Sequence, residues 1–237
     1  MFRDQQGRER ARVVPFPRPD GGVRWIARID PSDARDYTLA VATIAPSIEG
    51  ALAAGVMANR VVGRGSARCT TLEPWRPALR EFRRSAARMR RPSEGAWTLV
   101  LDVRECYASI STTAVETSLL DLGCDRAKVR SLLRLLERFG EDGVRGLPIG
   151  PDPSAILANA VLSAADRAIE RSGARFVRWV DDYVVAASTE RNARRALDAA
   201  GECLASLGLE THGEKTRIET AGARGGFRFS RVAGEGP

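Results

Sequence analysis

The sequence predicts an α+β domain, a β-sheet with helices on one side. Two kinds of segment lead to this prediction. Short runs rich in β-branched and aromatic residues, WTLVLDV and RFVRWVDDYVVAAS, indicate buried strands. Around them lie segments with apolar residues at helical spacing, bounded by capping residues, proline or glycine. At 237 residues the chain can bury one sizeable core and a small satellite subdomain.

Composition narrows the class of protein. The hydrophobic fraction of 43% suits a globular domain, and no apolar run is long enough to span a bilayer. The start, MFRDQQGRERARVV, has charges of both signs where a signal peptide needs an apolar core, so we expect a cytoplasmic protein. The scattered cysteines and the single histidine, His212, indicate neither a disulfide framework nor a zinc site.

The net charge of +7 favours a polyanionic partner. Lysine occurs only at Lys128 and Lys215, so the other basic residues are arginines, the type best suited to bidentate phosphate contacts. A genome-wide codon preference for arginine explains the same composition, and both interpretations stay open.

The first elements are a hairpin and a pair of helical pieces. Residues 13–30 read as two β runs around a Pro-Asp-Gly-Gly turn, which gives a basic hairpin. Residues 32–58 are helical with an interruption at Pro46, and Ser32 or Asp33 is the expected N-cap.

The middle of the chain begins with an arginine-rich helix at residues 75–91, whose basic face suits phosphates and equally suits plain solvation. Residues 97–103 form a nearly continuous apolar run, which is typical of a central strand buried on both faces. Two core helices are expected at residues 113–123 and 125–139.

A long helix should then begin at Asp152, with Pro153 at its first position, and end at Gly173. A polar helix is expected over residues 190–207.

Chemistry concentrates at an adjacent pair, Asp181 and Asp182, between two β-prone runs. Successive residues of a straight strand project to opposite faces, so both carboxylates converge only at a bend. A hairpin with both residues at its tip is the simplest arrangement. Their repulsion requires cations, and without nearby His or Cys the oxygen ligands favour Mg²⁺ or Mn²⁺. A solvent-exposed turn is the alternative.

Asp102 makes the metal interpretation more specific, because it ends a buried strand in which a lone carboxylate is costly. Three carboxylates on neighbouring strands are what a two-metal phosphoryl-transfer site needs. The expected catalytic and metal-binding set is therefore Asp102, Asp181 and Asp182.

In order and spacing these segments resemble the motifs of reverse transcriptases, particularly the bacterial retron-like, abortive-infection and defence-associated groups. LDVRECYASI resembles the first catalytic motif, GLPIGPDPSAILANAVLSAAD the second, WVDDYVV the third and GLETHGEKTRI the fourth. PRPDGGVRWI resembles the fingers hairpin. The resemblance covers most of the chain and implies an antiparallel polymerase palm with a small fingers subdomain.

The resemblance also implies roles for single residues. The three aspartates would hold two Mg²⁺ or Mn²⁺ ions. Tyr107 would be the aromatic gate that excludes a 2′-hydroxyl, with an ordinary core tyrosine as the alternative. Arg18 and Arg24 would clasp the incoming triphosphate. Gly146 and Gly150 would let the backbone approach the nucleotide, unless they only form a loop before a helix.

Three more residues complete the implied site. Lys215 would donate a proton to pyrophosphate, which arginine cannot do, and a stray surface lysine is the alternative. Ser154 and Asn159 would face the nucleotide, although capping and core hydrogen bonds explain them nearly as well.

The chain also departs from the family pattern. Ile149 stands where most reverse transcriptases have a polar residue, often glutamine, which leaves untemplated synthesis open. Trp179 replaces the usual tyrosine before the Asp-Asp pair. No thumb is evident after the fourth motif, so a partner protein, an RNA or a second copy would have to supply one.

We therefore expect a fingers-like region at residues 1–95, a palm at 96–220 that can interleave with it, and a primer-grip-like tail at 221–237. The expected activity is RNA-directed DNA synthesis from deoxynucleoside triphosphates on an RNA template, in bacterial antiphage defence. A non-catalytic nucleic-acid-binding subunit and a nucleotide cyclase on a related palm are the alternatives.

Overall fold

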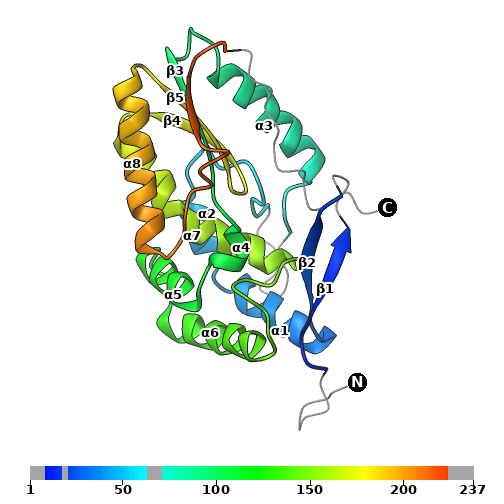
Figure 1. Cartoon of the computed structure of the whole chain (residues 1–237). Coiled ribbons are helices and arrows are strands. Elements are labelled where there is room, and N and C mark those ends of the chain that lie inside the picture. Colours follow the sequence, from blue (N-terminus) through cyan, green and yellow to red (C-terminus); the bar gives the residue numbers. More distant parts are fainter. Residues whose placement is uncertain (1–8, 18–20, 63–70, 224–237) are drawn as a thin grey trace. The chain divides into compact units, whose positions relative to one another are not determined.

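The structure is a computed structural model that describes residues 9–17, 21–62 and 71–223 (Figure 1). The chain divides into two compact units, each made of three separate stretches. The first unit comprises Met1–Ala51, Val61–Leu72 and Glu105–Val161, and the second comprises Leu52–Arg60, Glu73–Arg104 and Leu162–Pro237.

The first unit begins with the predicted hairpin. Strands β1 (Arg12–Pro17) and β2 (Val23–Arg28) pair antiparallel, with Phe16 opposite Arg24. Gly21 has a φ of 84°, the left-handed conformation that a hairpin turn between them needs. The hairpin is confirmed, whereas Arg18 lies outside the described residues.

Two helices follow, α1 (Pro31–Ala42) and α2 (Ala45–Ala51). The break between them comes at Thr43 and Ile44, ahead of the predicted position at Pro46. Pro46 instead lies in the first turn of α2, where a missing N–H leaves no helical hydrogen bond unmade.

The predicted N-cap of α1 is wrong by two or three residues. Asp30 caps the helix, because its carboxylate accepts a hydrogen bond from the Ser32 backbone N–H at 2.8 Å. Asp33 is buried one turn further on and pairs with Arg138 at 2.6 Å. This pair joins α1 to α6 (Arg126–Glu141).

The other helices of the first unit agree with the sequence analysis to within a few residues. They are α5 (Thr112–Asp121), α6 and the first half of α7 (Asp152–Arg171). Ser111 caps α5 and Asp125 caps α6 through side-chain oxygens. A four-residue helix, α4 (Cys106–Ser109), was not predicted.

The second unit contains a four-stranded antiparallel sheet in the order β4-β5-β3-β6. Its strands are β3 (Trp97–Asp102), β4 (Arg175–Trp179), β5 (Asp182–Ala187) and β6 (Arg217–Thr220). β3 pairs on both sides, with β5 and β6, and is almost wholly buried, which confirms the predicted central strand.

Helices cover both faces of this sheet, whereas the sequence analysis expected one side. Helix α3 (Trp75–Met89) packs against Trp179, with the Phe82 and Trp179 rings 5.8 Å apart. The second half of α7 bonds to Arg178, which projects to the opposite face from its neighbour Trp179. Helix α8 (Glu190–Ser206) also packs on the sheet, on the opposite side from α3 (Figure 1).

The described part of the chain has no helix that is both long enough and apolar enough to cross a bilayer. The cysteines within it are free thiols, at Cys106, Cys124 and Cys203.

Candidate active site

The turn between β4 and β5 carries the adjacent aspartates. Trp179 pairs with Asp182, so the two residues at the tip are Val180 and Asp181, and Asp182 is the first residue of β5. The prediction that both aspartates form the tip is therefore off by one residue. The positive φ that a tight turn needs is taken by Val180, at 55°. A β-branched residue rarely adopts this conformation, which is why the sequence did not indicate it.

Asp102 and Asp182 lie side by side on the adjacent strands β3 and β5. They are direct partners in the β3–β5 ladder, so their side chains project to the same face. They are also only 3% and 6% exposed. The backbone of Asp181 joins the same place, because its carbonyl oxygen accepts a hydrogen bond from the Val103 N–H at 3.3 Å. The ends of β3 and β5 thus bring together two of the three expected carboxylates, with the third residue beside them.

Lys215 supplies a cation to this pair. Its Nζ lies 3.1 Å and 3.3 Å from the two carboxylate oxygens of Asp102. A tight turn puts it there: the His212 N–H donates to the Asp102 carbonyl, and the His212 carbonyl accepts from the N–H groups of Lys215 and Thr216. The lysine side chain is 48% exposed, so its ammonium group lies between a buried carboxylate and solvent.

The donor set has the chemistry that a hard divalent cation requires. Asp102 and Asp182 offer oxygen ligands, and a nearby cation such as the ammonium of Lys215 stabilises facing carboxylates. Within the described ranges, no three His, Cys, Asp or Glu side chains are arranged closely enough to hold a metal ion. The carboxylates therefore fit a metal by their chemistry, whereas a three-carboxylate cluster remains a prediction.

The residues expected to contact the nucleotide belong to the first unit. Tyr107 lies in α4 and is half-buried, and its carbonyl accepts a hydrogen bond from the Leu147 N–H at 2.8 Å. Gly146 passes close to this helix. It has a φ of 62°, and a Cβ there would lie 2.7 Å from the Ala108 carbonyl carbon. Only glycine fits this contact, so the second motif and the residue expected to be the sugar gate are held together by backbone.

The same loop is also joined to the hairpin. The Ala27 N–H of β2 donates to the Ile149 carbonyl at 2.9 Å, next to Gly150, which has a φ of 127°. Arg24 lies on the same strand and is partly buried. Three of the expected nucleotide-side residues, Arg24, Tyr107 and Gly150, are thus linked through one hydrogen-bonded loop.

Ser154 differs from these. It is fully buried, and its hydroxyl lies 3.0 Å from the hydroxyl of Tyr37 in α1. Asn159 is also buried. For Ser154 this geometry favours the core hydrogen bond over a nucleotide contact.

The sequence matches the model of a known protein family. A family model for reverse transcriptase (RNA-dependent DNA polymerase) matches residues 57–229, which is most of the chain. This chain belongs to the reverse transcriptase family. The resemblance to reverse transcriptases, the fold class and membership of a family of nucleotidyltransferases are thereby confirmed, whereas the bacterial subgroup stays a prediction.

Among solved structures, the reverse transcriptase is similar to apo telomerase from Candida tropicalis truncated from its C-terminal domain. The TM-score is 0.59 at 13% sequence identity, so this match shows a similar fold and nothing more. It covers 90% of this chain and 50% of the telomerase chain. No curated protein matches the sequence.

Two buried residues of this reverse transcriptase were not predicted from its sequence. Arg178 of β4 and Asp166 of α7 form an ion pair with side chains 0% and 1% exposed. An arginine inside an apolar strand two residues before the turn was the signal that could have found them, because such a charge needs a buried partner.

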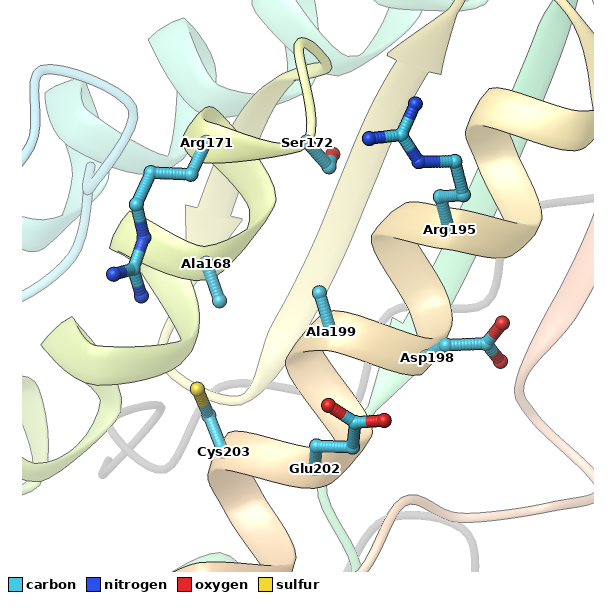
Figure 2. Close-up of a pocket in the computed structure, with 8 residues that line it drawn as sticks. All are labelled: Ala168, Arg171, Ser172, Arg195, Asp198, Ala199, Glu202 and Cys203. Carbon is cyan, nitrogen blue, oxygen red and sulfur yellow. The ribbon is translucent and has the colours of Figure 1, made fainter.

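A surface pocket of about 410 Å³ lies between α7 and α8 (Figure 2). Its charged lining has both signs, with Arg171 on α7 and Arg195, Asp198 and Glu202 on α8. In Figure 2 the Asp198 side chain points away from α7. The pocket contains none of the residues expected in the site of the reverse transcriptase.

Proposed function

We propose that this reverse transcriptase is an RNA-directed DNA polymerase that adds deoxynucleotides to a primer 3′-hydroxyl. The observation that carries the proposal is the facing pair Asp102 and Asp182, buried at the ends of adjacent strands with Lys215 beside it. The family of the chain supports the same reaction.

Each side chain of this group has a defined task. Asp102, Asp181 and Asp182 would bind two divalent ions, Mg²⁺ or Mn²⁺. The ions, when bound, would activate the primer hydroxyl and stabilise the leaving pyrophosphate. The primer oxygen would lose its proton to solvent and form a bond to the α-phosphorus, while the bond between that phosphorus and the oxygen bridging to the β-phosphate would break. Lys215 would then give its proton to the departing pyrophosphate.

The nucleotide-side residues act on selection and binding. We propose that Tyr107 excludes a ribose 2′-hydroxyl, and that Arg18 and Arg24 neutralise the triphosphate. Gly150 would let the backbone approach the nucleotide. Ser154 would contribute through the core, by holding the start of α7 against Tyr37.

We also propose a palm and a fingers subdomain. A palm over residues 96–220 would centre on the four-stranded sheet, and fingers over residues 1–95 on the β1–β2 hairpin. A tail at residues 221–237 would act as a primer grip, and all of it beyond residue 223 lies outside the described residues.

The test is primer extension on an RNA template with purified protein, Mg²⁺ and deoxynucleoside triphosphates. We expect extension by the wild type and a loss of at least about a thousandfold in the Asp181→Asn/Asp182→Asn double variant. Asp198→Asn, on α8, serves as the control. Equal extension by the wild type and the double variant would exclude the proposed site.

Template-independent synthesis at the same site is the second candidate, favoured by Ile149 in place of the usual polar residue. Omitting the template from the same assay separates the two, because only untemplated synthesis continues. We further propose a role in bacterial antiphage defence, in the cytoplasm, which the resemblance to abortive-infection and defence-associated enzymes supports. Phage challenge of cells that carry the wild-type or the double-variant gene tests that role.

A further inference from the structure

Arg178 is a fully buried arginine in the strand that leads to the aspartate turn. Its guanidinium group binds Asp166 through two parallel hydrogen bonds, Nε to Oδ1 at 2.9 Å and Nη2 to Oδ2 at 2.7 Å. Asp166 lies on α7, and both side chains are excluded from water. The bidentate geometry fixes the plane of the guanidinium group relative to the helix.

The third guanidinium nitrogen reaches the turn itself. Nη1 of Arg178 donates to the Val180 carbonyl oxygen at 2.8 Å. This carbonyl belongs to the peptide bond between Val180 and Asp181, directly before the aspartates. Val180 has a φ of 55°, which is unfavourable for a β-branched residue and must be held by its surroundings.

The strand that carries Arg178 is itself anchored. The Arg178 N–H donates to the Gly55 carbonyl at 2.8 Å, and its own carbonyl accepts from the Met57 N–H at 2.9 Å. The guanidinium group also lies over the ring of Tyr183, the residue after Asp182, at 5.5 Å. Backbone and side chain are therefore both fixed, so the position of Nη1 is determined by α7 and the sheet together.

We propose that Arg178 and Asp166 are positioning residues that hold the turn in its strained conformation and thereby set where Asp181 and Asp182 point. The proposal rests on the function proposed for these aspartates. Stability alone is a weak reason for such a pair, because buried ion pairs are commonly replaced by apolar residues of similar size without loss of stability. What an apolar pair could not supply is the hydrogen bond to the Val180 carbonyl.

The test uses the double variant Arg178→Met/Asp166→Leu, which removes both buried charges together and leaves neither one unpaired. The matched control is Arg175→Met/Glu94→Leu, which removes the ion pair of the same strand at its far end. Arg178→Lys is the second variant, since it keeps a charge for Asp166 and loses the planar fork. Thermal melting establishes that each variant is folded.

The first readout is amide hydrogen–deuterium exchange of the peptide covering residues 179–183, which needs neither metal nor substrate. We expect exchange about tenfold faster or more in the double variant and in Arg178→Lys, with β3 unchanged. The control should exchange like the wild type. A folded double variant with wild-type exchange in this peptide overturns the proposal.

The second readout is primer extension. We expect kcat to fall by about tenfold or more in the double variant, with KM for the nucleotide changed by less than about threefold. Wild-type kcat in a folded double variant also overturns the proposal. An inactive wild type would instead refute the proposed function, while the exchange measurement still decides whether Arg178 holds the turn.

Discussion

Asp102 and Asp182 owe their place in the structure to the register of two strands. Pairing β3 with β5 so that these residues are opposite puts both carboxylates on one face, and burial makes their repulsion strong. The ammonium of Lys215 offsets part of that repulsion from a turn 113 residues further along the chain. At this scale the site is a balance of buried charges.

Substitution of Lys215 separates its two tasks. Lys215→Arg keeps a cation beside Asp102 and replaces a side chain that can donate a proton at usable pH with one that cannot. We expect the single-turnover rate of primer extension to fall by about a hundredfold or more. The control is Lys128→Arg, which changes the other lysine. A rate within about twofold of the wild type would leave Lys215 with a charge-balancing role only.

Tyr37 should make the stability depend on alkaline pH. Burial raises the pKa of the Tyr37 hydroxyl, and the hydrogen bond to Ser154 lowers it by less. The folded state therefore keeps this proton at a pH where the unfolded state releases it, so the free energy of unfolding falls as pH rises above about 10.

The variant Tyr37→Phe tests this directly by urea unfolding at pH 7.5 and 10.5. At pH 7.5 it should lose about 1 kcal/mol with the hydrogen bond to Ser154. Its loss of stability between the two pH values should be smaller than that of the wild type. An equal loss in both proteins would show that Tyr37 does not titrate on unfolding.

At the scale of elements, helix α3 carries a basic surface on the side of the sheet that bears Asp102 and Asp182. Its apolar residues pack on Val177, Trp179 and Val184, which project to the same face as Asp182. Its exposed side contains five arginines and one acid, Glu81. The arginines are Arg76, Arg80, Arg83, Arg84 and Arg88.

This surface should bind the phosphates of an RNA–DNA duplex. We expect Arg80→Gln/Arg83→Gln to weaken binding. The plot of the logarithm of the association constant against the logarithm of the salt concentration should become less steep by about 1.8, the value for two lost phosphate contacts. The matched control is Arg191→Gln/Arg195→Gln on α8, across the sheet. Fluorescence anisotropy measures both. Equal salt slopes for the two variants would show that α3 is merely solvated.

The loop of the second motif should tolerate no side chain at Gly146. A Cβ there meets the backbone of α4, whereas the positive-φ residue Gly143 has nothing within 4 Å of its Cβ position. Both alanine variants carry the cost of a positive φ, about 1–2 kcal/mol, and only Gly146→Ala adds a backbone clash. Urea unfolding should therefore find Gly146→Ala the less stable of the two. Equal stability would mean that the loop can move away from α4.

At the scale of the whole molecule, most helices and strands could be predicted from the periodicity of apolar residues and from capping, proline and glycine residues. These signals act locally along the chain. The central strand, the long helix after Pro151 and the hairpin before α1 follow directly from such patterns. The sheet order does not, because strand pairing joins segments far apart in sequence.

The features of the site that the sequence did not indicate also depend on long-range contacts. The turn at Val180 contradicts local propensity and depends on Arg178, whose partner Asp166 resembles any polar residue of a helix. Ser154 had the pattern of a nucleotide-side residue, and only packing against α1 reveals its bond to Tyr37. The sequence could indicate that Asp102 and Asp182 lie at the ends of neighbouring strands, whereas it could not indicate the contacts that orient their side chains.

The proposed reaction requires Asp102 and Asp182 to bind a divalent cation. The direct measurement is Mn²⁺ binding, followed by electron paramagnetic resonance of the free ion in the presence of a deoxynucleoside triphosphate. We predict that Asp182→Asn weakens Mn²⁺ binding by about tenfold or more, because a neutral amide replaces an ionised ligand. Asp198→Asn should bind as the wild type does. Unchanged Mn²⁺ binding in Asp182→Asn would contradict a role of Asp182 as a ligand of the cation.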